Sequence, residues 1–234
     1  MVRGALLLIV VLVDLMALGP AEGLPWTPTE LEAGGSQRRT DEGGPPVAPE
    51  DRVLNVAYFS SAQLTDEVHA AIAGEVERIF AEIGFEVRTH DVEELSSPGA
   101  PAPETLLRLM ILEQGAERWG INPAALGAMI GRQEPPSAVY LFASPIRRVL
   151  GIANRPDGYL SAEAVGRAFG RVAVHEIVHA YAPDHPHSGW GITGHAQDAR
   201  SLTQAGIVLD DRAARAFTEA WQRLMTARAP LAEG

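Results

Sequence analysis

The chain has 234 residues, of which 46% are hydrophobic and 21% are charged, and it contains no cysteine. This length and apolar content suit one ordinary domain with a tail and exclude a wholly disordered chain, while the missing cysteine excludes disulfides, thiolate metal ligands and a cysteine nucleophile. Lys and Arg number 19 against 30 Asp and Glu, a net charge of −11. Because such a chain repels phosphate groups, we expect no nucleic-acid partner.

The first residues have the pattern of a secretory signal peptide. Arg3 supplies a positive charge, residues 4–18 are almost wholly apolar, and small residues follow directly. We therefore expect residues 1–23 to be cleaved and the protein to be secreted or periplasmic, with no stable membrane association afterwards. The alternative is a membrane anchor formed by residues 4–19. Against it, the apolar run is shorter than the roughly 20 residues that span a bilayer, and Asp14 interrupts it.

Residues 24–51 are rich in Pro, Gly and charges and lack an apolar period. This composition is typical of a disordered linker or a short pro-segment. The remaining residues, 52–228, show no internal repeat and no second boundary. We expect them to form a single domain.

This domain begins with a strand, a helix and a second strand. The apolar run at 53–59 and the residues at 85–92 predict two strands. Between them, apolar residues spaced by three and four predict a long amphipathic helix with Ser60 or Ser61 as its N-cap. Because a helix connects them, the two strands should run parallel with a right-handed crossover.

Three more strands are expected, at 106–112, 126–130 and 138–143. Two more helices are expected, one at 161–182 and one from Asp210 or Asp211 onward. A turn-rich stretch separates strands 126–130 and 138–143, which favours a hairpin. The predicted fold class is α/β: a mixed, mostly parallel sheet packs on a long helix and on the 161–182 helix, and a small C-terminal part contains one helix.

The segment from Val174 to Ser188, VHEIVHAYAPDHPHS, carries the candidate chemistry. His175 and His179 are four residues apart, so on a helix they project from the same face. Two imidazoles placed in this way can bind one metal ion. Glu176 lies about 100° further round the helix, from where it can reach a metal-bound water as a general base without being a ligand.

At these residues the sequence resembles the metzincin zinc metallopeptidases, matrixins and archaemetzincins among them, whose signature is HExxHxxGxxH. His175, Glu176, His179 and His185 match the signature position by position. The resemblance implies one zinc ion bound by His175, His179 and His185, with Glu176 activating the water. It also implies a zincin-like fold and a peptide or protein substrate that lies along the edge strand at 126–130.

The turn after the helix departs from this signature. Ala182, followed by Pro183, replaces the signature glycine, and alanine before proline resists the positive φ that glycine accepts. The helix must therefore end by another route. That leaves His187 open as the alternative third ligand, and Asp184 as a further candidate.

The methionine turn of the family is a second departure. No methionine lies between the motif and the last helix, and residues 191–193 align with the turn, so that Thr193 takes the place of the methionine. Because that methionine supports the site by packing, its absence should loosen the site without abolishing metal binding. A zincin class that takes its third ligand from a later helix would instead use Glu219.

The sequence thus predicts a secreted zinc metalloendopeptidase. The alternative is an exported zinc-binding domain with a weakly active or inactive site, acting as a binding or structural module. Glu176 favours the enzyme, because a pure binding site does not need it, whereas Ala182, Pro183 and Thr193 favour the module.

Overall fold

The computed structural model describes residues 8–9, 52–91, 94–96, 100–102, 105–114, 120–130, 136–153, 159–189, 191–194 and 197–228. The signal peptide expected at 1–23 and the linker expected at 24–51 therefore lie outside the described residues, apart from residues 8–9. Among the described residues, no helix combines the length and the apolar character that a membrane span requires.

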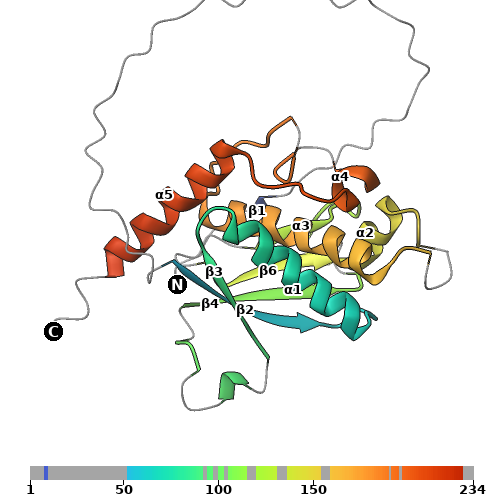
Figure 1. Cartoon of the computed structure of the whole chain (residues 1–234), viewed down its shortest axis with the longest axis horizontal. Helices are drawn as coiled ribbons and strands as arrows, with labels where there is room; N and C mark the ends of the chain where they lie inside the picture. Colours follow the sequence, from blue (N-terminus) through green and yellow to red (C-terminus); the bar gives the residue numbers. More distant parts are fainter. Residues whose placement is uncertain are drawn as a thin grey trace, which may run out of the picture.

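One six-stranded sheet, in the order β1-β5-β6-β4-β2-β3, forms the centre of the described structure (Figure 1). Its strands are β1 (Leu8–Ile9), β2 (Val53–Ser60), β3 (Glu86–His90), β4 (Leu106–Leu112), β5 (Gly127–Ile130) and β6 (Ala138–Phe142). Neighbouring strands from β3 to β6 pair in parallel, whereas β5 pairs antiparallel with both β6 and β1. The mixed, mostly parallel sheet and the β5–β6 hairpin are thus confirmed.

The helices are α1 (Asp66–Ala81), α2 (Ala143–Val149), α3 (Ala162–Tyr181), α4 (Ala199–Thr203) and α5 (Asp211–Arg228), with a short 3-10 turn at Glu94–Ser96. The predicted cap of α1 at Ser60 or Ser61 is wrong. β2 extends to Ser60, and Thr65 is the N-cap, its hydroxyl accepting the Val68 N–H at 3.4 Å. Ser161 caps α3 as expected.

Helices α1 and α3 pack tightly against each other on the sheet, and two glycines of α3 allow this approach (Figure 1). A Cβ added at Gly166 would lie 2.3 Å from the Ala71 Cβ, and one at Gly170 would lie 2.8 Å from the Glu75 Cβ. Both distances are below any van der Waals contact, so a larger residue would push the helices apart. These glycines therefore serve the packing of α3, although they lower its intrinsic helix propensity.

A cluster of the buried Glu75 and Arg171 with the half-buried Arg78 ties together α1, α3 and the end of α4. The Glu75 carboxylate accepts hydrogen bonds of 2.9 Å from Arg78 Nε, Arg78 Nη2 and Arg171 Nε. Arg171 is 1% exposed and also donates to the carbonyl oxygens of Ser201 and Gln204. This arginine–glutamate cluster satisfies its own polar groups and fixes the segment that follows the candidate site.

Candidate metal centre

Helix α3 brings His175 and His179 together one turn apart, and the chain returns after the helix to add His187. The ring centroids lie 4.8 Å apart for His175 and His179, 4.6 Å for His179 and His187, and 5.2 Å for His175 and His187. One ring nitrogen from each residue lies within 4.8 Å of the other two. We call these three residues the histidine cluster, and its geometry can hold a metal ion.

The hydrogen bonding of the helical histidines leaves ring nitrogens unpartnered. His175 Nδ1 lies 2.8 Å from the Ile192 carbonyl oxygen, which can only accept, so Nδ1 carries the proton and Nε2 keeps a lone pair available for a metal. His175 Nε2 and both ring nitrogens of His179 are buried without a hydrogen-bond partner. A buried polar atom left in this way costs about 1–3 kcal/mol, and a metal ion relieves that cost. The donor set therefore fits zinc, which prefers neutral imidazole ligands.

Burial also keeps these imidazoles neutral. It lowers the pKa of His175 to about 4 and the pKa of His179 to about 3, with smaller contributions from the neighbouring histidines. Since metal ligands have to be deprotonated, neutral rings near pH 7 are the form that binds a metal.

Glu176 is enclosed between α3 and strand β5. The residue is 2% exposed, and burial raises the pKa of its carboxyl group to about 8. A Cβ added at Gly127 of β5 would lie 2.6 Å from Glu176 Cγ and 2.8 Å from Glu176 Oε1. Strand β5 thus leaves, at Gly127, the space that the Glu176 side chain fills. The sequence pattern did not single out this glycine.

Helix α3 ends at Tyr181 without a left-handed residue. Ala182 has φ −123° and ψ 68°, and its N–H donates to the Val178 carbonyl oxygen at 2.8 Å. The His185 N–H then donates to the Ala182 carbonyl oxygen at 3.0 Å, forming a tight turn. The expectation that the helix ends by another route than a glycine turn is confirmed.

This turn separates the two candidate third ligands. The structure groups His187 with the helical histidines, where the family signature favoured His185. The ring of His185 lies 6.1 Å from that of His179 and contributes no atom to the cluster. The physical reason is the negative φ of Ala182, −123°, since it directs the chain differently from the positive φ of a signature glycine.

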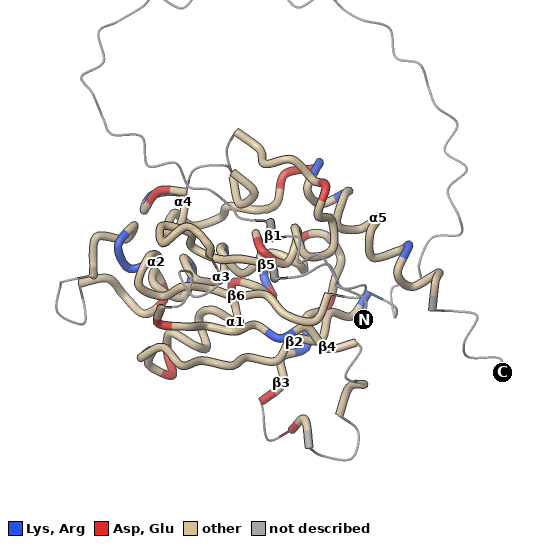
Figure 2. Tube along the Cα trace, turned by 180° about the vertical axis from the view of Figure 1, so that it is seen from behind, with Lys and Arg blue, Asp and Glu red and all other residues tan. Residues whose placement is uncertain are grey.

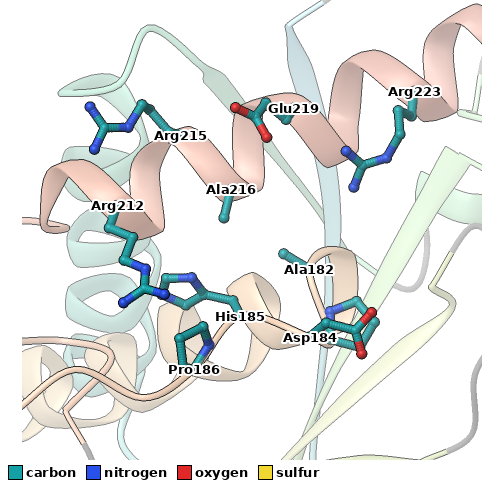
Figure 3. A pocket seen from close by; sticks show the side chains of 10 residues that line it. Ala182, Asp184, His185, Pro186, Arg212, Arg215, Ala216, Glu219 and Arg223 are labelled. Atoms are coloured by element: carbon teal, nitrogen blue, oxygen red, sulfur yellow. The ribbon is translucent and has the colours of Figure 1, made fainter. Parts of the chain in front are cut away.

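His185 instead lines a pocket of about 370 Å³ between residues 182–186 and helix α5 (Figure 3). Figure 3 shows its ring beside Arg212. Burial lowers the pKa of His185, the negative charge of Asp210 opposes this, and the Arg212 guanidinium adds to the lowering. Asp184 and Glu219, the other candidate ligands, line the same pocket and not the histidine cluster. Acidic and basic positions are interspersed along α5 (Figure 2), so the pocket has a mixed charge.

Residues 191–194 form the turn expected to replace the methionine turn. Gly191 has φ +81°, and the Gly194 N–H donates to the Gly191 carbonyl oxygen at 3.2 Å. Ile192 within this turn provides the carbonyl oxygen that orients His175. Thr193 is fully buried and its hydroxyl donates to Asp210 Oδ2 at 3.0 Å. The place of this turn is predictable from the sequence, whereas the bond to Asp210 is not, because it joins residues 17 positions apart outside regular structure.

Comparison with known proteins gives little similarity. No protein-family model matches the chain, and no curated protein matches its sequence. Among solved structures, the archaemetzincin from Methanopyrus kandleri aligns with a TM-score of 0.47 and 12% sequence identity, over 75% of this chain and 97% of that one. A likeness of this degree does not assign the chain to a family, so its function has to follow from the residues of the site.

Proposed function

We propose that this protein is a zinc-dependent peptidase in which His175, His179 and His187 bind the metal and Glu176 is the general base. The observation that carries the proposal is the histidine cluster, with buried ring nitrogens that lack hydrogen-bond partners and with Glu176 next to the first ligand. A site that only bound metal would have no use for a buried carboxyl group at this position.

Zinc, when bound, supplies a Lewis acid that polarises a carbonyl group and makes water more acidic. The Glu176 carboxylate takes a proton from the attacking water and passes it to the leaving amine nitrogen of the substrate. His175 keeps its orientation through the Ile192 carbonyl oxygen, and Gly127 leaves room for the base beside the sheet.

The proposed substrate is a peptide that extends along the outer edge of β5, as a further antiparallel strand. In support, β5 pairs antiparallel with residues Leu8 and Ile9 at this edge. In the exported form that we propose, cleavage of residues 1–23 removes this pairing and leaves the edge to the substrate. The mature protein then acts in the periplasm or outside the cell, without a membrane anchor.

One observation favours the alternative function, an exported zinc-binding module without peptidase activity. Glu176 is 2% exposed, so its carboxyl group has little access to water in this conformation. The two functions differ in whether Glu176 matters for an activity or only for packing.

The test compares the wild type with Glu176→Ala on a broad peptide library, with zinc measured in both proteins. If the protein is a peptidase, the wild type should cleave peptides. The cleavage rate of Glu176→Ala should be about 10²–10⁴-fold lower, while its zinc content stays that of the wild type. The matched control is Glu163→Ala, at an exposed position on the same helix with 75% side-chain exposure, which should cleave normally. Zinc in the wild type without any cleavage would leave only the binding module.

A further inference from the structure

Thr193 holds the residue next to His187 by two contacts. Its carbonyl oxygen accepts the Ser188 N–H at 2.9 Å, and its hydroxyl lies 3.1 Å from Ser188 Oγ. Residues 188 and 194 also form an isolated parallel bridge. Because Ser188 follows His187 directly, the position of His187 depends on these contacts.

On its other side, Thr193 is fixed to the start of helix α5. Its hydroxyl donates to Asp210 Oδ2 at 3.0 Å, so Ser188 has to be the donor in the Ser188–Thr193 hydroxyl contact, since a hydroxyl has one proton. Asp210 Oδ1 accepts the N–H groups of Arg212 and Ala213 at 3.0 and 2.9 Å and thereby caps α5. The hydrogen-bond chain Ser188–Thr193–Asp210 therefore links the third histidine to a fixed helix end.

The residue before Thr193 acts on the first histidine. The Ile192 carbonyl oxygen accepts from His175 Nδ1 and from Gln197 Nε2, both at 2.8 Å. One short turn thus orients His175 through residue 192 and fixes the chain beside His187 through residue 193. Partners of metal ligands that act in this way typically change metal affinity by 10–100-fold when they are removed.

We propose that Thr193 is a positioning residue for the metal centre, and that its hydrogen-bond chain to Ser188 and Asp210 replaces the methionine packing expected at this turn. This inference rests on the proposed zinc function. A methionine could not make the same bonds, because a thioether is a weak acceptor and has no proton to donate to Asp210. Threonine here is a different solution to the same task, and the site is not looser for lacking the methionine.

The test measures the zinc dissociation constant, by competition with a chromophoric chelator, and the absorption spectrum of the cobalt(II)-loaded protein. Thr193→Val keeps the shape but removes the hydroxyl, and it should weaken zinc binding about 10–100-fold and change the cobalt spectrum. Thr193→Ser keeps a hydroxyl at this position and should bind zinc nearly as tightly as the wild type does. Thr193→Met should resemble Thr193→Val. The control is Thr218→Val. In the wild type the Thr218 hydroxyl donates to the Ala214 carbonyl oxygen within α5, so its removal should leave zinc binding unchanged.

Urea unfolding of the metal-free proteins separates positioning from stability. A Thr193→Val protein that is less stable, but binds zinc and cobalt like the wild type, would overturn the inference. If Thr193→Val does not fold, Ser188→Ala removes only the hydroxyl contact and has to weaken zinc binding in the same direction; unchanged binding would overturn the inference. His175→Ala is measured alongside, because a wild type without zinc would refute the proposed function itself and not only the role of Thr193.

Discussion

Helix α3 carries two buried polar clusters one turn apart, and they differ in whether their polar atoms have partners. In the arginine–glutamate cluster, Arg171 and Glu75 bond to each other, to Arg78 and to backbone carbonyl groups. In the histidine cluster, His175 Nε2 and both nitrogens of His179 have no hydrogen-bond partner. These three nitrogen atoms are buried, so solvent does not compensate for the missing hydrogen bonds.

The comparison shows that two buried polar clusters on one helix meet their hydrogen-bonding needs in different ways. Buried polar atoms in folded proteins are almost always hydrogen-bonded, because an unpartnered one is costly. The arginine–glutamate cluster meets this requirement from the chain alone, which is typical of a structural role. The histidine cluster does not meet it from the described chain, which indicates that a metal ion completes it.

The largest effect should follow from breaking the satisfied cluster. Glu75→Ala leaves the charge of Arg171 buried without its carboxylate, which should lower the free energy of unfolding by about 3–5 kcal/mol. Urea unfolding of the metal-free protein measures this. The matched control is Glu86→Ala, whose ion pair with Arg88 has side chains 57% and 55% exposed, and which should cost about 0–1 kcal/mol. Equal effects of the two changes would contradict the structural role of the buried cluster.

A smaller effect should follow from filling the space beside Glu176. An added Cβ at Gly127 would lie 2.6 Å from Glu176 Cγ, so Gly127→Ala should destabilise the protein by about 1–3 kcal/mol. The displaced carboxyl group should also slow peptide cleavage, while zinc content stays as in the wild type. Gly74→Ala is the control, because nothing lies within 4 Å of its added Cβ. Normal cleavage by Gly127→Ala would show that this contact does not position the base.

The smallest effect concerns acid stability. Burial opposes ionisation of Glu75, yet hydrogen bonds from Arg78 and Arg171 hold its pKa below the ordinary 4.5. A carboxylate with a lowered folded pKa contributes stability that is fully present above its unfolded pKa and is lost as the pH falls through its folded pKa. The stability difference between wild type and Glu75→Gln should therefore shrink below pH about 4.5. Urea unfolding from pH about 7 to about 3 measures it, and a constant difference would refute the assignment.

Regular elements were predictable from the sequence because their spacing fixes which residues share a face. The four-residue spacing of His175 and His179 places them together on any helix, and the apolar patterns predicted strands β2 to β6 and the three long helices, although not β1, whose residues were assigned to the signal peptide. The cap of α1 was missed because Ser60, Ser61 and Thr65 are all good N-caps. The strand pairing decides among them, because the Ser61 N–H donates to the Ile111 carbonyl oxygen and so keeps Ser61 beside the sheet.

The rest of the site depends on backbone angles outside regular structure. The place of His185 and His187 follows from the angles of Ala182 and the turn after it, which no spacing rule gives. The bond from Thr193 to Asp210 and the contact of Gly127 with Glu176 join residues distant in sequence. The sequence signal for Gly127 was a small residue in the strand predicted at 126–130, and that signal does not say which side chain faces it.

The most direct test of the metal site is the zinc content per chain, measured by mass spectrometry after purification without chelator, in the wild type, His187→Ala and His185→Ala. We predict one zinc ion per chain in the wild type, its loss from His187→Ala and its retention in His185→Ala. The opposite pattern in the two variants, or a wild type that stays without zinc after zinc is added, would contradict the histidine cluster as the metal centre.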